Sequence, residues 1–399
     1  MHLHRTHVTI ILGIAQTLSW ASSYYLLAVL AEPISRTVDI SYSFVFGAFS
    51  IALLVAAVVG PVAGRLIDRF GGRPVLMASS FIFAAGLLLL SQATEAFHVF
   101  FAWAVMGVAM GGGLYEAAFS AVVYLYGQKA RSVITGITLF AGFASTVGWP
   151  LSGYLEGVYG WETVCVVWAV LHLLIGFPLN ALLCKAARER EESRVGQDDV
   201  AVKQLVEKGT DADAEGRNRR RNAWLMAYVF AVSWFISTAM AAHLPQVLQA
   251  SGALLVAAIA AAALVGPAQV AGRILEYSFL KRAHPLLSAR LAILAHPIAA
   301  LCLGVFGASA IYVFTIFHGL GNGILTIAIG TLPLKVFGAE GYGQRQGWLM
   351  APARVVQAGS PFLFGLALAN WGSYALLLSA LLALSAFMAL WAMRVNTRQ

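Results

Sequence analysis

The sequence predicts an all-α protein whose helices cross a membrane twelve times. Hydrophobic residues make up 60% of the 399 residues and charged residues only 11%, whereas a soluble protein carries roughly 25% charged residues. The apolar residues form continuous runs of about 20, which is the length of a helix that spans a bilayer. These runs do not alternate between apolar and polar residues, so they indicate helices and not the strands of a membrane barrel.

Twelve apolar runs follow one another along the chain. We expect helices at roughly residues 8–31, 42–64, 74–92, 98–126, 133–155, 163–184, 223–249, 253–275, 287–306, 310–334, 347–370 and 372–393. The opening residues, MHLHRTHVT, lead into the first run with no small-residue cleavage site, so we interpret that run as an uncleaved helix. The three cysteines lie far apart and form neither a metal-binding spacing nor a disulfide framework. No metal or cofactor is expected.

One long hydrophilic segment, residues 185–222, divides the runs into two groups of six. It contains the sequences REREE and RNRRR and almost no large apolar residues. Such a segment buries too little apolar surface to fold alone, and we expect a flexible or partly helical linker. The predicted domains are a six-helix bundle at residues 1–184, this linker, and a second six-helix bundle at residues 223–399.

The basic residues indicate the orientation of the chain. If the termini and every second loop share one side, that side holds 24 of the 26 lysines and arginines, and the other side holds only Arg36. The remaining base, Arg354, lies inside an apolar run. Because cytoplasmic loops carry the excess of Lys and Arg, both termini are predicted to be cytoplasmic. The same distribution argues against nucleic acid as the reason for the net charge of +8.

The two groups of runs also repeat each other. The sequence GRLID at Gly64–Asp68 recurs as GRILE at Gly272–Glu276, an offset of 208 residues, and Ser19-Trp20 recurs as Ser233-Trp234, an offset of 214. Glycine and proline positions in the fourth and fifth runs recur at offsets of 211 to 212. These matches indicate a parallel duplication of a six-helix unit.

The loop after the second run carries a recognisable motif. It reads GPVAGRLIDRFGGRP and has the pattern G-x-x-x-D-R-x-G-x-R, formed by Gly64, Asp68, Arg69, Gly71 and Arg73. With the duplication, this motif resembles the signature of the major facilitator superfamily. The resemblance implies two pseudo-symmetric six-helix bundles that carry a solute by alternating access, and no enzymatic activity. It also implies that Asp68 faces the start of helix 11 in a latch that gates the cytoplasmic side. The alternative is that these charges only determine the membrane topology of the chain.

The second copy of the motif contains Gly272, Arg273 and Glu276. Tyr277 stands where the first copy has Arg69, so we expect the first latch to be the stronger one.

Two charged residues lie inside apolar runs. Arg354 is expected about eight residues into helix 11, roughly 12 Å from its cytoplasmic end. Glu116 is expected near the middle of helix 4. Such charges need partners or water. Arg354 could bind a substrate anion or form a structural pair with Glu116 or Asp68, and Glu116 could carry a coupling proton or only neutralise a base.

Other polar residues could line the central cavity, which the resembled fold builds from helices 1, 4, 7 and 10. The candidates for substrate binding are Trp20, Tyr24, Tyr25, His243 and Asn322, together with Gln16. For each of them a polar group satisfied between helices is an equally good interpretation. Motifs of hydrolases, metalloenzymes and nucleotide-binding proteins are missing from the sequence.

The opening third of the chain also resembles the bacterial oxalate/formate and monocarboxylate branch of the superfamily. That resemblance implies carboxylate binding by Arg273 and Arg354. The sequence therefore favours a monomeric carrier of a small organic anion in the bacterial inner membrane, with proton coupling through Glu116 left open. The alternative is an exporter of hydrophobic or cationic compounds, of the multidrug type, and a third class is a transporter-like receptor.

Overall fold

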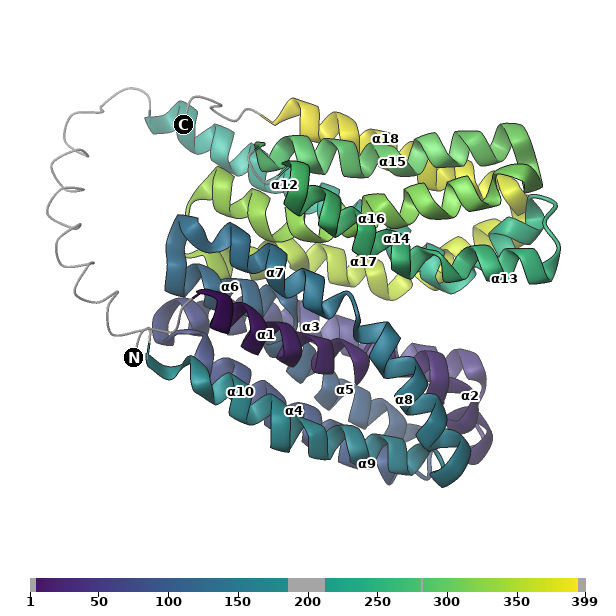
Figure 1. Ribbon diagram of the computed structural model, residues 1–399, viewed down its shortest axis with the longest axis horizontal. Coiled ribbons are helices and arrows are strands. Elements are labelled where there is room, and N and C mark those ends of the chain that lie inside the picture. Colours follow the sequence, from purple (N-terminus) through teal and green to yellow (C-terminus); the bar gives the residue numbers. More distant parts are fainter. Residues whose placement is uncertain (1–4, 186–211, 281–282, 394–399) are drawn as a thin grey trace, which may run out of the picture.

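The computed structural model describes residues 5–185, 212–280 and 283–393, and these residues form helices and turns with no strand. Figure 1 shows two packed halves, the first below and the second above. The first half contains α1 (Arg5–Ala21), α2 (Leu27–Thr37), α3 (Tyr42–Phe70), α4 (Gly72–Ser91), α5 (Ala96–Gly113), α6 (Tyr115–Tyr126), α7 (Arg131–Ala141), α8 (Ala144–Tyr159), α9 (Trp161–Leu171) and α10 (Phe177–Ala181). The second half contains α12 (Ala212–Ala250), α13 (Leu255–Ala263), α14 (Val265–Leu275), α15 (Pro285–Phe306), α16 (Ile311–Phe337), α17 (Tyr342–Trp371) and α18 (Ala375–Ala392).

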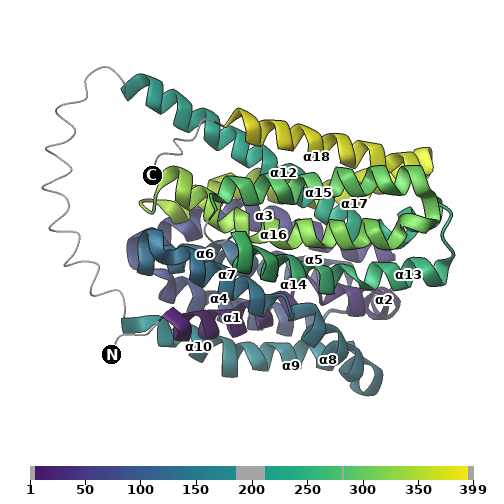
Figure 2. The same cartoon turned by 45° about the horizontal axis from the view of Figure 1, so that its top comes forward.

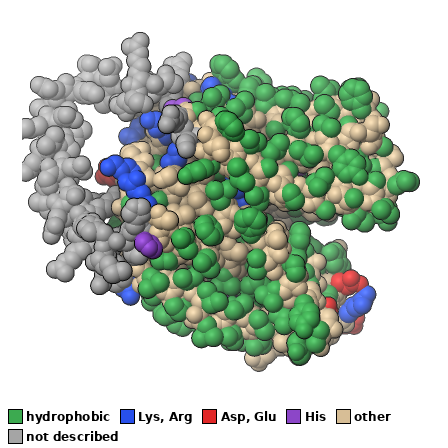
Figure 3. All heavy atoms as spheres, viewed as in Figure 1, with side chains coloured by type: hydrophobic (Ala, Val, Ile, Leu, Met, Phe, Trp, Pro, Cys, Tyr) green, Lys and Arg blue, Asp and Glu red, His purple; other side chains and the backbone are tan. Residues whose placement is uncertain are grey.

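The helices have the length and the surface of a membrane protein. Eight stretches of the described chain are long and apolar enough to cross a bilayer, and three of them, at 51 to 64 residues, suffice for more than one crossing. Side chains such as Val256 and Phe362 are 81% and 75% exposed. Figure 3 shows hydrophobic side chains covering both halves between their ends. The all-α membrane fold is confirmed, and the division into twelve crossings stays a prediction.

Several expected helices are interrupted in the structure, namely those at 8–31, 98–126, 133–155, 163–184 and 253–275. The first bends between α1 and α2, where the Ser22 hydroxyl donates to the Leu18 carbonyl at 2.9 Å and satisfies backbone inside the turn. The fourth breaks at Leu114, which is extended at φ −86° and ψ −167°. A π-helical turn at His172–Gly176 interrupts the sixth.

The last eleven residues of the expected linker, 212–222, form the start of α12. Four of these eleven residues are arginine and two are alanine, which favour helix. Arg219 and Arg221 donate to the carbonyls of Phe337 and Ala392 at 3.3 and 3.0 Å, so the extension is anchored to the second half. The rest of the predicted linker, residues 186–211, lies outside the described residues.

Each half has its own hydrophobic core. The first core draws on residues between Val8 and Leu183, with Leu334 and Tyr342 as its only members from the second half among the described residues. The second core draws on residues between Met226 and Met393. Figures 1 and 2 show this division from two directions. The exact domain bounds remain a prediction.

Glycines form the seam where α3 of the first half meets α17 of the second. A Cβ on Gly64 would lie 2.0 Å from the Gly343 carbonyl oxygen, and a Cβ on Gly347 would lie 2.5 Å from Pro61. The two backbones therefore touch, as small residues allow between membrane helices. We call the end of the molecule where α3 ends and α17 begins the motif end, and the opposite end the far end.

Candidate functional site

Arg354 lies deep between the two halves. Because α17 begins at Tyr342, five residues earlier than expected, Arg354 is twelve residues into the helix, or about 18 Å at ~1.5 Å per residue. The expected depth of 12 Å is thus too small. The residue is 4% exposed. A guanidinium at this depth requires partners, and the structure provides them from α6, α12, α17 itself and the turn between α1 and α2.

Glu116 is the acid partner of Arg354. Arg354 Nη2 lies 2.8 Å from Glu116 Oε1, and the side chains are 5% and 13% exposed. The break at Leu114 places Glu116 in the first turn of α6, where the helix dipole favours a negative charge. Of the two acids proposed as structural partners, the structure pairs Arg354 with Glu116.

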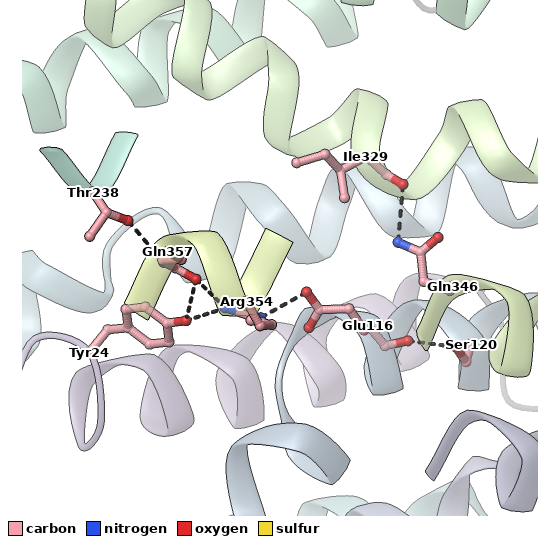
Figure 4. Close-up of polar contacts among 8 residues, drawn as sticks. All are labelled: Tyr24, Glu116, Ser120, Thr238, Ile329, Gln346, Arg354 and Gln357. Atoms are coloured by element: carbon pink, nitrogen blue, oxygen red, sulfur yellow. Dashed lines mark hydrogen bonds and ion pairs between the residues drawn. The ribbon is translucent and has the colours of Figure 1, made fainter. Parts of the chain in front are cut away.

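Tyr24, Gln357 and Thr238 complete the polar network, which Figure 4 displays. Arg354 Nη1 donates to the Tyr24 hydroxyl and, at 3.1 Å, to Gln357 Oε1. Gln357 Nε2 donates to the Thr238 hydroxyl at 3.0 Å. Tyr24 and Glu116 belong to the first half, and the other members of the network belong to the second. The network therefore joins the halves through Arg354.

Aromatic rings surround the guanidinium. Arg354 Cζ lies 5.2 Å from the centre of the Trp234 ring, a cation–π distance. Trp20 packs against Tyr24 and Tyr115 with centroids 4.5 and 4.8 Å apart. Sequence analysis missed Tyr115, Gln357 and Thr238 as site residues. Trp234 was identified only as the repeat of Trp20. That equivalence could have placed both tryptophans between the two halves, beside Arg354.

Arg273 is a second buried cation between the halves. It is 5% exposed, and its Nη1 donates to the Thr138 carbonyl of α7 at 2.9 Å. No described acid lies within 4 Å of it. Its charge interacts with Tyr25 and Tyr115, which connects it electrostatically to the aromatic group.

Three predicted cavity residues lie elsewhere. His243 Nε2 contacts the Pro361 carbonyl at 2.8 Å and its Nδ1 contacts Gln246, which ties α12 to α17 away from the network. Asn322 lines a small cavity inside the second half with His296 and His318. Gln16 donates to the Gly113 carbonyl at 2.6 Å. The sequence placed them on the right helices, but helix rotation decides which neighbours they meet.

The motif residues lie at the motif end. Both carboxylate oxygens of Asp68 accept backbone N–H bonds at the start of α17, from Gly343 at 2.9 Å and Gln344 at 2.8 Å. Gly71 has φ +81°, which glycine adopts without strain. The guanidinium of Arg69 lies 5.0 Å from the Phe70 ring centre, and Arg73 lines a surface cavity of about 710 Å³.

The second copy of the motif also joins the halves. Glu276 is 1% exposed and pairs with Arg131 of α7 at 2.8 Å. Arg131 further donates to the carbonyls of Ala283 and Leu280 at 2.7 and 3.0 Å. An arginine from the other half thus supplies the base that the second motif lacks. Gly272 packs so closely on α16 that a Cβ would lie 2.4 Å from the Leu320 carbonyl oxygen.

Comparison with known proteins assigns the family. The model of the Major Facilitator Superfamily matches residues 12–306, more than half of the chain, and the chain belongs to this superfamily. The solved structure of the proton:xylose symporter XylE has the same fold, with a TM-score of 0.74 at 12% identity over 97% of this chain and 95% of that one.

Two curated relatives are similar to part of the chain. The agnestins efflux protein AgnL12 of Paecilomyces divaricatus is 30% identical over 174 residues, which are 43% of this chain and 37% of that protein. The probable nitrate/nitrite antiporter NarK1 of Thermus thermophilus is 31% identical over 180 residues, 42% of this chain and 40% of that protein. The match thus covers about two fifths of the length of these two relatives.

Proposed function

We propose that this transporter moves a small organic anion of the monocarboxylate type by secondary active, alternating-access transport. The observation that carries the proposal is Arg354, a buried cation that contacts both halves at once. We further propose that it acts as a monomer in the bacterial inner membrane, with both termini in the cytoplasm. These last points rest on the distribution of basic residues.

Arg354 is suited to hold a substrate carboxylate. A guanidinium offers several N–H donors in a planar fork that matches a carboxylate. In the structure this fork is occupied by the carboxylate of Glu116, together with Tyr24 and Gln357. A substrate carboxylate would take the place of Glu116 on Arg354, and the site would keep its charge balance when Glu116 takes up a proton.

This exchange gives a physical route to proton coupling. Protonation of Glu116 removes its negative charge and leaves Arg354 as a buried, uncompensated cation, which is costly. A substrate anion that binds at that moment restores neutrality. Proton and anion are therefore expected to bind together, which is the requirement for symport.

Arg273 is proposed as a second cation that attracts the anion. It is buried without an acid neighbour among the described residues and interacts with Tyr25 and Tyr115. The name of the relative NarK1 refers to transport of anions, which supports an anion over a neutral solute.

The structure represents a state that is closed at the motif end. Asp68 at the start of α17 and the Arg131–Glu276 pair both bind one half to the other there. At the far end Figure 3 shows the halves parting. The network of Arg354 lies between these ends, so rocking of the halves about it would expose the site to either side in turn.

An exporter of hydrophobic or cationic compounds is the second candidate. The observation that favours it is the cluster of Trp20, Tyr24, Tyr115 and Trp234 next to the Arg354–Glu116 pair, since aromatic faces bind cations and an acid neutralises them. The relative AgnL12, named as an efflux protein, supports this candidate.

A thermal-shift measurement on the purified protein in detergent separates the two. A ligand that binds only the folded protein raises the melting temperature. We expect small carboxylates to stabilise the wild type and to lose this effect in Arg354→Ala. Stabilisation by hydrophobic cations, equal in both proteins, would favour the exporter and make Arg354 structural.

A further inference from the structure

Two tryptophans from opposite halves face each other beside Arg354. The ring centroids of Trp20 in α1 and Trp234 in α12 lie 6.3 Å apart, and the ring planes differ by only 3°. The two residues occupy equivalent places in the internal repeat, 214 residues apart. We call them the indole pair. Because each half contributes one ring, the separation of the pair changes when the halves move.

The indole pair also has two unused hydrogen-bond donors. Nε1 of Trp20 and Nε1 of Trp234 are buried, and among the described residues neither meets an acceptor. Buried donors normally have partners, and an exception at a site between moving halves points to a ligand atom that supplies one. Trp103, inside the first half, has an unpaired Nε1 as well. The inference therefore depends on the pairing of the two rings across the halves and not on the donors alone.

A positive charge lies within reach of the same space. The guanidinium carbon of Arg354 is 5.2 Å from the centre of the Trp234 ring and 5.7 Å from that of Tyr24. Tyr24 in turn packs on Trp20 at 4.5 Å. The region between the halves is thus bounded by flat aromatic faces, two free N–H groups and one guanidinium that is bound to Glu116.

We propose that the anion carried by this site is a planar aromatic carboxylate, with its ring between Trp20 and Trp234 and its carboxylate on Arg354. The proposal rests on the proposed function and narrows its substrate class. A flat ring in van der Waals contact with both indoles needs ring planes about 7 Å apart, twice ~3.5 Å. The centroid distance of 6.3 Å is the upper limit of the present spacing between the planes, so the halves must separate for the ring to enter. A puckered aliphatic ring is thicker and offers no π face.

Benzoate and cyclohexanecarboxylate test this directly, because they share a carboxylate and a six-membered ring and differ in flatness. Binding of each is measured on the purified full chain by thermal shift and by titration of tryptophan fluorescence. We expect the wild type to bind benzoate roughly tenfold more tightly, as two aromatic contacts of ordinary strength allow. In Trp20→Leu and in Trp234→Leu the ratio of the affinities for benzoate and cyclohexanecarboxylate should fall toward one.

Trp224→Phe is the matched control, since Trp224 is 71% exposed and outside the site. This variant should keep the full preference for benzoate over cyclohexanecarboxylate. If a leucine variant does not fold, Trp234→Phe replaces it and should keep part of the preference, because it keeps a flat ring. Equal binding of the two acids by the wild type, or a preference that survives both leucine variants, would overturn the inference and leave the anion site standing. Binding of neither acid would overturn the proposed anion function with it.

Discussion

At the scale of single residues, the polar network between the two halves is centred on one arginine, Arg354. The sequence pointed to Arg354 and Glu116 because charges inside apolar runs stand out. It left the partner open, since helix rotation cannot be read from a sequence that is apolar on every side. Tyr115 and Gln357 were missed for the same reason: an aromatic ring or an amide in such a helix fits a core as well as a site.

A double-mutant cycle should show that Arg354 and Glu116 depend on each other. Glu116→Gln leaves a buried cation alone and Arg354→Gln leaves a buried acid alone, so each should destabilise the protein by roughly 3–5 kcal/mol. The double variant leaves no unpaired charge and should be more stable than the sum of the two losses predicts. Unfolding free energies in detergent provide the measurement. Simple additivity would mean that the pair does not interact in solution.

Glu116→Gln also tests proton coupling. A glutamine cannot take up a proton, so transport by this variant should lose its dependence on pH. The measurement is uptake of a carboxylate into proteoliposomes over a pH series, with Glu95→Gln, an exposed glutamate at the start of α5, as control. Unchanged pH dependence in Glu116→Gln would remove the proton-carrying role from this residue.

His284, between α14 and α15, should make stability depend on pH. Its Nδ1 accepts the Leu286 N–H at 3.1 Å and caps α15, which requires an unprotonated nitrogen. Burial lowers the pKa of His284 below its usual 6.5, and the nearby Lys335, Arg131 and Arg290 lower it further. The contribution to stability is thus complete above the unfolded pKa and is lost as the pH falls through the lowered folded pKa.

We therefore expect the melting temperature of the wild type to fall between about pH 7.5 and 5.5 by more than that of His284→Asn, because asparagine keeps a cap acceptor that does not titrate. Parallel melting curves for the two proteins would contradict this role.

At the scale of elements, the departures from regular helix are what position the site. The sequence indicated where the helices lie but not where they break, because Leu114 is an ordinary helix former and its extended backbone is open to any residue. The break is stabilised by a distant contact, from Gln16 to the Gly113 carbonyl. Without the break at Leu114, Glu116 would lie in the middle of a continuous helix and not in the first turn of α6.

The glycine seam between α3 and α17 yields a prediction at this scale. Gly64→Ala places a methyl group 2.0 Å from the Gly343 carbonyl oxygen, so the two helices must separate. We expect faster amide hydrogen exchange at the start of α17 and a lower melting temperature. Gly153→Ala in α8, where a Cβ meets nothing within 4 Å, is the matched control and should behave like the wild type. Unchanged exchange in Gly64→Ala would show that the seam tolerates separation.

At the scale of the whole molecule, two contacts related by the duplication close the motif end. The duplicated sequence and its charge distribution predicted the fold, because both persist over the entire chain. The sequence did not predict that Arg131 forms the second contact. This residue lies outside the motif and reaches Glu276 only when the two halves meet. The expectation of a stronger first latch stays a prediction.

Removing the charge of Asp68 or of Glu276 should each weaken the closure of the motif end. Asp68→Asn weakens the contact with the start of α17, and Glu276→Gln leaves Arg131 without its acid. Because the two contacts share no residue, their effects on opening should add. Hydrogen exchange at the starts of α7 and α17 reports each contact separately. A double variant no more open than either single one would mean that one contact alone sets the closed state.

The separate cores have a consequence for how the protein is made. Since the first core draws almost entirely on residues 8–183, a ribosome that has delivered this half into the membrane has delivered nearly everything the core requires. The first half can therefore pack while the second is still being synthesised. Tyr342 and Leu334 arrive last, so the nascent first half presents a gap at its edge that only the finished chain fills. Assembly of the two halves would then be the final step of biogenesis, and the same surfaces that later rock against each other would be the ones that meet last.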